Sequence, residues 1–311
     1  MTFGLMLILR GVVRGIHVAA SLSILGAVSA RLIFLSVALE QMTSNARDQL
    51  VRAMNTLLQV SLFIALTGGA IWLFLETIYI IDSDKWSDVL ASLAPVIWYT
   101  NFGHLLIIRL ALLIIAVSVF SITGTRNRIY AATSLAAFAA ALQAGLGHGA
   151  AMAGIEGNVL LTALVLHLLA AGLWLGSLLP LYIAISAVSP EVAHKIAKRY
   201  SVLGTICVLT LIATATLQAW FLAGGISGLV GTAYGRVAMV KIFMFLVLIV
   251  FAACNRNIFT PALIGEQASL AKSHLRRVIF AEMLAGVTVI ILAGILLQLS
   301  PGMDMSMAGN M

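Results

Sequence analysis

The sequence predicts an all-α membrane protein, a polytopic bundle of about eight transmembrane helices that forms one domain over residues 1–311. Three observations lead to this prediction. The chain is 62% hydrophobic and only 9% charged, with a mean hydropathy of +1.10, which is outside the range of soluble domains. Apolar segments of about 20 residues recur along it, long enough for a helix to cross roughly 30 Å of hydrocarbon. Their apolar residues are continuous rather than alternating, which argues against an outer-membrane barrel.

Eight spans follow from the apolar segments. Backbone groups in lipid must be satisfied internally, so each span should be a helix. The first, second and fifth spans are longer than one crossing requires, which predicts tilt or extension beyond the hydrocarbon. The expected spans cover residues 3–37, 50–80, 102–122, 129–146, 159–187, 201–223, 237–253 and 278–299.

The connections between spans alternate in their content of Lys and Arg, and cytoplasmic connections of membrane proteins carry the excess. In the even-numbered connections and the segment after Pro301, the only basic residues are Lys85 and Arg236. We therefore expect these segments and both termini to be periplasmic. The net charge of +7 follows from the same bias and requires no nucleic-acid partner. The connections rich in Lys and Arg, expected to be cytoplasmic, contain Arg47, Arg52, Arg126, Arg128, Lys195, Lys198, Arg199, Arg256, Lys272, Arg276 and Arg277.

Internal similarity divides the chain into two four-helix parallel repeats, residues 1–150 and 151–311. His17 and Gly26 in the first span recur as His167 and Gly176 in the fifth, each displaced by 150 positions. A parallel repeat gives corresponding helices equivalent orientations about an axis along the membrane normal. The first span resembles a secretion signal, but its removal would leave one repeat incomplete, so we expect it to be retained. The other matched pairs are Ala20 and Ala170, Leu25 and Leu175, Ile64 and Ile212, Ala65 and Ala213, Trp72 and Trp220, Thr100 and Thr232, Phe102 and Tyr234, Gly103 and Gly235, Arg109 and Lys241, Leu142 and Leu297, Gln143 and Gln298, and Gly147 and Gly302.

Four of the six histidines are expected on the outer side of the membrane. His17 and His167 lie in the outer halves of their spans, His104 opens the third span, and His148 lies in the fourth connection. Imidazole suits copper, and polar side chains within spans are costly enough to suggest a function. The structural alternative for the two span histidines is an interhelical hydrogen bond. For the other two it is a capping or solvated residue.

Methionine sulfur is the second group that suits copper, because thioethers favour Cu(I). Met152 follows His148 closely, and the C-terminal segment carries methionines at alternate positions. An ordinary disordered terminus is the alternative for this segment. The candidate metal ligands are therefore His17, His104, His148, His167, Met152, Met303, Met305 and Met307.

The fifth span, from His167 to Gly176, resembles the signature of the CopD family of bacterial copper-resistance membrane proteins. Lys241 lies in a second similar pattern, and Glu282 stands where the family's last helix carries an acidic residue. The resemblance is strongest over residues 160–300. It implies copper handling at the inner membrane, often beside the small periplasmic copper-binding protein CopC. The second pattern consists of Tyr234, Gly235, Arg236, Lys241, Asn255, Arg256 and Pro261.

The resulting prediction is binding and transport or relay of copper, as Cu(I) or Cu(II), across the lipid bilayer of the bacterial inner membrane. Two alternatives remain open. One is a b-type haem electron-transfer protein, because histidines on neighbouring helices can ligate haem. The other is a copper capture or assembly partner that does not translocate the ion. The sequence lacks GxxxxGK[ST] and HExxH motifs and any GxSxG motif in a suitable context, so we predict neither an enzyme nor an ATP-driven pump.

Overall fold

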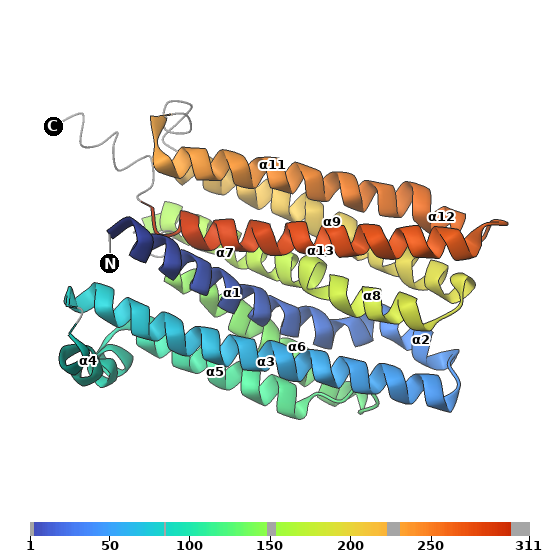
Figure 1. Cartoon of the computed structure of the whole chain (residues 1–311), viewed down its shortest axis with the longest axis horizontal. Coiled ribbons are helices and arrows are strands. Elements are labelled where there is room, and N and C mark those ends of the chain that lie inside the picture. The colour runs from blue at the N-terminus through green and yellow to red at the C-terminus, as the bar shows by residue number, and fades with distance from the viewer. Residues whose placement is uncertain (1–2, 84, 148–153, 223–230, 300–311) are drawn as a thin grey trace.

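A computed structural model describes residues 3–83, 85–147, 154–222 and 231–299, and every secondary-structure element in them is a helix. Eight helices in these ranges are long and apolar enough to cross a membrane, which confirms the predicted all-α membrane bundle. Most lie along the long axis of the molecule (Figure 1). The elements are α1 (Phe3–Ala30), η1 (Arg31–Leu35), α2 (Ser36–Glu40), α3 (Ser44–Ile81), α4 (Trp86–Tyr99), α5 (Asn101–Val119), α6 (Arg126–Leu142), η2 (Gln143–Leu146), α7 (Gly154–Trp174), η4 (Leu175–Ser177), α8 (Leu178–Ala187), α9 (Pro190–Leu222), α11 (Ala233–Cys254), η5 (Asn255–Phe259), α12 (Thr260–Ala262) and α13 (Ala268–Leu296).

In three spans a turn of different helical pitch joins two α-helices. A π-helical turn, η1, joins α1 to α2, and a second, η5, joins α11 to α12, whereas the 3-10 turn η4 joins α7 to α8. With these continuations the first and fifth spans measure 37 and 34 residues, and the second, which is α3 alone, measures 38. The predicted extra length of these three spans is confirmed.

Two helices extend well beyond the predicted apolar boundaries. α9 begins at Pro190 rather than near residue 201, and α13 begins at Ala268 rather than near residue 278. Apolar content marks only the part of a helix that crosses hydrocarbon. Lys and Arg are good helix formers, so the helices continue through the basic residues of these connections. Pro190 also suits a helix start, where its missing N–H group is not needed.

The second connection, expected to be a loop, contains the helix α4. This helix lies across the end of the bundle at which α1 begins and α13 ends (Figure 1). It buries Val89 and Val96 and exposes Trp98 and Tyr99. Tryptophan and tyrosine favour the boundary between lipid and water. The acidic residues at the start of the connection obscured this amphipathic pattern.

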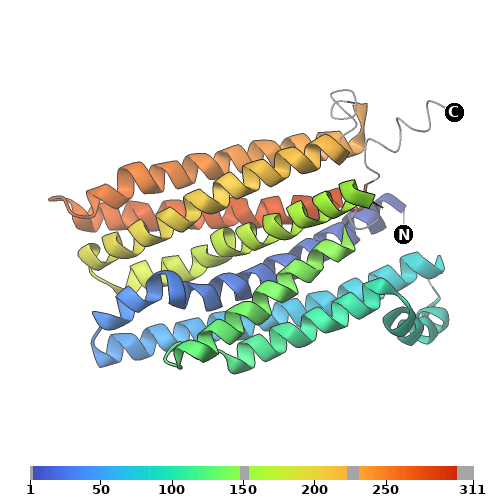
Figure 2. The same ribbon diagram turned by 180° about the vertical axis from the view of Figure 1, so that it is seen from behind.

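The helix α1 lies at the centre of the bundle. In both views it runs between a group containing α3, α5 and α6 and a group containing α7, α9, α11 and α13 (Figures 1 and 2). In the most apolar 18-residue window of the first span, 72% is buried inside the protein. The corresponding share is 6% for the span that begins with α11. The exposed side chains of α11 are apolar, Phe243 and Val250 among them, and therefore suit contact with lipid.

The helix α1 approaches the second group very closely at its Gly26, which meets Gly176 of η4. A Cβ atom on either glycine would overlap backbone atoms of the other segment. The hydroxyl of Ser177 donates a hydrogen bond to the carbonyl of Gly26 at 3.2 Å. Small residues permit this approach of two helix backbones within a membrane. The two glycines are also a matched pair in the internal similarity.

Candidate functional site

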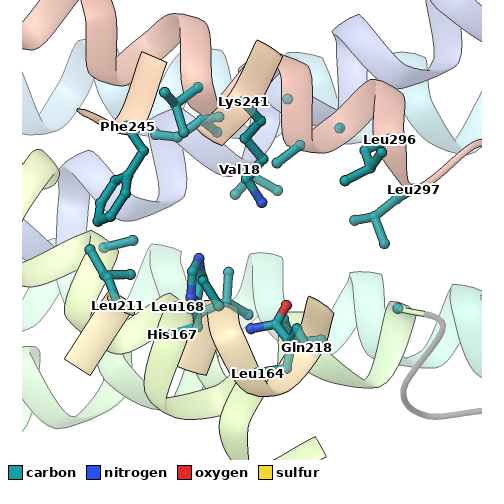
Figure 3. Close-up of a pocket in the computed structure, with 18 of the residues that line it drawn as sticks. Val18, Leu164, His167, Leu168, Leu211, Gln218, Lys241, Phe245, Leu296 and Leu297 are labelled. Atoms are coloured by element: carbon teal, nitrogen blue, oxygen red, sulfur yellow. The ribbon is translucent and has the colours of Figure 1, made fainter. Parts of the chain in front are cut away.

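A cavity of about 240 Å³ lies between α1, α7, α9, α11 and α13. Along α7 it extends from Leu160 to Trp174, about 20 Å at a rise of 1.5 Å per residue. Its lining is mostly apolar, and none of the described residues that line it is acidic. A few polar side chains enter it near the middle (Figure 3). An apolar cavity with a small set of convergent polar groups is typical of a ligand site.

His167 is the candidate ligand that lines this cavity. Its Nδ1 lies 2.9 Å from the hydroxyl of Thr214 on α9, and that hydroxyl donates to the carbonyl of Thr210 at 2.7 Å. We assign the tautomer of His167 from this bond: because the hydroxyl donates its own proton to the backbone, it accepts the proton of Nδ1. The lone pair of neutral His167 is then on Nε2, which is the nitrogen available to a metal.

Lys241 and Gln218 approach the same cavity from other helices. Figure 3 shows the nitrogen atoms of His167 and Lys241 directed into the cavity from facing walls. The Nε2 atom of Gln218 is buried without a hydrogen-bond partner among the described residues. Gln218 and Thr214 were not singled out from the sequence, although a polar residue within an apolar span was a usable signal.

His17 lies in a closed cluster. Its side chain is 0% exposed, and its Nδ1 is 2.8 Å from the carbonyl oxygen of Ala65 on α3. The ring centroid of His17 is 5.7 Å from that of Trp72, which is 5.0 Å from that of Phe102. The Nε2 atom has no described hydrogen-bond partner. The contact with Ala65 is an interhelical hydrogen bond of the kind expected under the structural alternative.

The matched tryptophans account for the difference between the two histidine environments. Trp72 is 1% exposed and packs beside His17, whereas Trp220 is 82% exposed. Trp220 is not among the residues that line the cavity beside His167. Trp72 therefore fills the space beside His17, whereas its counterpart Trp220 is turned outward and leaves the space beside His167 open.

Two carboxylates within the spans, Glu76 and Glu282, belong to separate networks. Arg10 pairs with Glu76 at 2.8 Å. Glu282 accepts hydrogen bonds from the indole of Trp174 at 3.1 Å and from the amide of Asn255 at 2.7 Å. Neither carboxylate contributes to the lining of the cavity.

Replacing Arg10 by Leu should lower the free energy of unfolding by about 2 kcal/mol, because Glu76 loses its ion-pair partner. The side chains are 8% and 18% exposed, so the loss should fall below the 3–5 kcal/mol typical of a fully buried pair. The double variant Arg10→Leu, Glu76→Gln should regain most of the loss, since glutamine is neutral. Thermal unfolding in detergent measures both effects. A double variant as unstable as Arg10→Leu would contradict this account.

The remaining candidate ligands do not join His167 in the described structure. His104 is exposed at the start of α5, where its Nε2 lies 2.9 Å from the carbonyl oxygen of Trp98. Among the described residues, no group of three or more His, Cys, Asp or Glu side chains is arranged to hold a metal ion. Five candidates lie outside the described residues: His148, Met152, Met303, Met305 and Met307.

Comparisons with known proteins agree on one family. The family model for the Copper resistance protein D-like N-terminal domain matches residues 6–159, and the model for Copper resistance protein D matches residues 194–296. The chain is 25% identical to Copper resistance protein D of Pseudomonas syringae pv. tomato over 275 residues, 84% of this chain and 88% of that protein. It is 26% identical to the inner membrane protein YebZ of Escherichia coli (strain K12) over 183 residues, 57% of this chain and 61% of that protein. The second match thus spans less than two thirds of that relative. No solved structure matches.

The two family models match both halves of the chain in consecutive order. The likeness to an inner membrane protein, together with the eight candidate spans, confirms the predicted location as a multi-pass protein of the inner membrane. The resemblance noted in the fifth span is confirmed at the level of the family: the chain belongs to the CopD family, copper resistance protein D.

Proposed function

We propose that this protein binds copper on the periplasmic side of the inner membrane and transports or relays it across the bilayer. One observation carries the proposal. A copper-resistance family member presents an imidazole nitrogen, Nε2 of His167, in a cavity within its membrane bundle. Imidazole is a ligand for copper in both oxidation states. Copper is the cargo in this proposal.

We further propose that copper is captured by residues at the outer end and handed inward. His104 is exposed at that end and would meet copper before His167 does. A periplasmic copper-binding protein similar to CopC is the proposed donor. His17 belongs to the proposed ligand set because it lies within the outer half of its span and matches His167 in the internal similarity. His148, Met152, Met303, Met305 and Met307 belong to it on their chemistry and position in the sequence alone.

The proposed architecture is two parallel four-helix repeats that divide near residue 150. Corresponding helix starts support it. Thr100 accepts a hydrogen bond from the backbone N–H of Gly103 at 3.0 Å, and Thr232 accepts one from Gly235 at 2.9 Å. The two span histidines also use the same ring nitrogen to contact the following long helix.

We propose that both termini are periplasmic. The start of α1, the end of α13 and the helix α4 lie at one end of the bundle (Figure 1). The connections rich in Lys and Arg follow the first, third, fifth and seventh spans, which end at the opposite side. The usual excess of basic residues in cytoplasmic connections supports this orientation.

A flux assay tests the transport step. Protein reconstituted in liposomes, with orientation checked by protease accessibility, would receive radioactive Cu(I) under reducing conditions. Accumulation of copper in the lumen beyond that of empty liposomes is the expected result. Copper that stays bound to the protein without luminal accumulation would overturn the transport step and favour a capture or assembly role.

A further inference from the structure

We infer that the cavity beside His167 is a binding site for a long-chain carboxylate whose head group lies against Lys241. This inference is independent of the proposed copper function. It rests on the charge of the cavity, its hydrogen-bonding groups and its shape.

The cavity carries positive charge, and the described carboxylate that acts on Arg14, Glu76, lies outside the lining and is already paired with Arg10. Arg14 and Lys241 both line it, and no described lining residue is acidic. Within the described part of the chain, Lys241 makes neither an ion pair nor a hydrogen bond. A charged group in a low-dielectric setting without a partner is costly. An anionic ligand would remove this cost, whereas a bare cation would increase it.

Two hydrogen-bond donors at the cavity also lack acceptors. Arg14 donates through Nη2 to the carbonyl of Leu146 at 2.7 Å, but its buried Nε has no described partner. The buried Nε2 of Gln218 has none either. An ionised carboxylate is an acceptor with two oxygens and about four lone-pair sites. One such group at Lys241 would still have lone pairs free for a second donor.

The shape of the cavity indicates what the acidic group is attached to. Leu211 and Phe245 lie on one side of the polar side chains, and Leu296 and Leu297 lie on the other (Figure 3). The volume of about 240 Å³ is distributed over the length from Leu160 to Trp174 of α7, so the cavity is long and narrow. A compact inorganic anion would leave the apolar ends unfilled. An alkyl chain attached to an acidic group at Lys241 would extend toward one of these apolar ends and bury its methylene groups there.

A carboxylate at this position is compatible with copper at His167. The positive charge of Lys241 opposes a copper ion at the facing imidazole. Neutralisation of that charge by a bound carboxylate would reduce the repulsion.

Binding of tritiated palmitate to the full-length protein in detergent, measured without copper, tests the inference. We expect saturable binding that unlabelled palmitate displaces and hexadecanol, with the same chain but no carboxylate, does not. Lys241→Met should weaken binding about tenfold or more, because a charge-assisted hydrogen bond is lost. Lys241→Arg should retain binding. Lys198→Met is the matched control, since Lys198 is exposed and does not line the cavity.

Displacement by hexadecanol as effective as by palmitate would overturn the inference, as would unchanged binding in Lys241→Met. If Lys241→Met unfolds, wild-type protein and Lys241→Arg still decide the question through the hexadecanol comparison. Competition by phosphatidylglycerol distinguishes a free fatty acid from a two-chain anionic lipid as the source of the anionic head group. Stronger competition by this two-chain lipid than by palmitate would contradict the single-chain ligand. Because no copper is present, failure here leaves the transport proposal standing, and failure of transport leaves this site standing.

Discussion

Replacing Gly26 by Ala should strongly destabilise the bundle, whereas the same substitution at Gly4 should leave its stability intact. Both glycines lie in α1. A Cβ at Gly26 would overlap backbone atoms of Gly176 and Ser177, while a Cβ at Gly4 would meet no atom within 4 Å. A rigid backbone cannot rotate away as a side chain can. We therefore expect a loss of about 3 kcal/mol, at the upper end of the usual range for overpacking.

The comparison of these two variants isolates the contact. Alanine favours helix over glycine by about 1 kcal/mol at both positions, so intrinsic propensity cannot account for opposite outcomes. Thermal unfolding and size-exclusion chromatography in detergent report assembly. Wild-type stability in Gly26→Ala would show that α1 and η4 do not cross at this point.

Replacing His167 by Ala should weaken copper binding by about 100-fold while the protein remains folded, an effect of nearly 3 kcal/mol. The imidazole supplies the nitrogen that we assign to copper. Its loss should cost little stability, because Thr214 keeps its hydrogen bond to the carbonyl of Thr210 at 2.7 Å and the side chain borders an existing cavity. Copper titration with a competing chelator measures the affinity.

His274→Ala is the control for this substitution. His274 is exposed near the start of α13 and stacks on Phe259, away from the cavity. Its replacement should leave copper affinity unchanged. Loss of folding in His167→Ala without a separate loss of copper binding would instead assign His167 a role in helix packing.

The fold could be predicted from the sequence because lipid imposes a simple requirement. Continuous apolar segments of sufficient length must be helices, and this gave all eight spans. The starts of α9 and α13 and the existence of α4 could not be found in this way. Helix propensity continues through basic residues, and an amphipathic helix at the membrane boundary lacks a long apolar run.

The candidate site could be predicted only in part. A histidine within an apolar span identified both His17 and His167, and their spacing suggested equivalent positions. The sequence could not show that Trp72 fills the space beside one histidine while Trp220 turns away from the other. Side-chain direction depends on how each helix is rotated and packed, and the short sequence identities do not determine that.

Metal analysis with an absorption spectrum of the purified protein, before and after loading with Cu(I) under reducing conditions, tests the central claim most directly. If the protein binds copper on the outer side of the bundle, the purified protein should retain copper tightly and show no Soret band. A Soret band without retained copper would contradict the account and identify the protein as a haem-binding electron carrier.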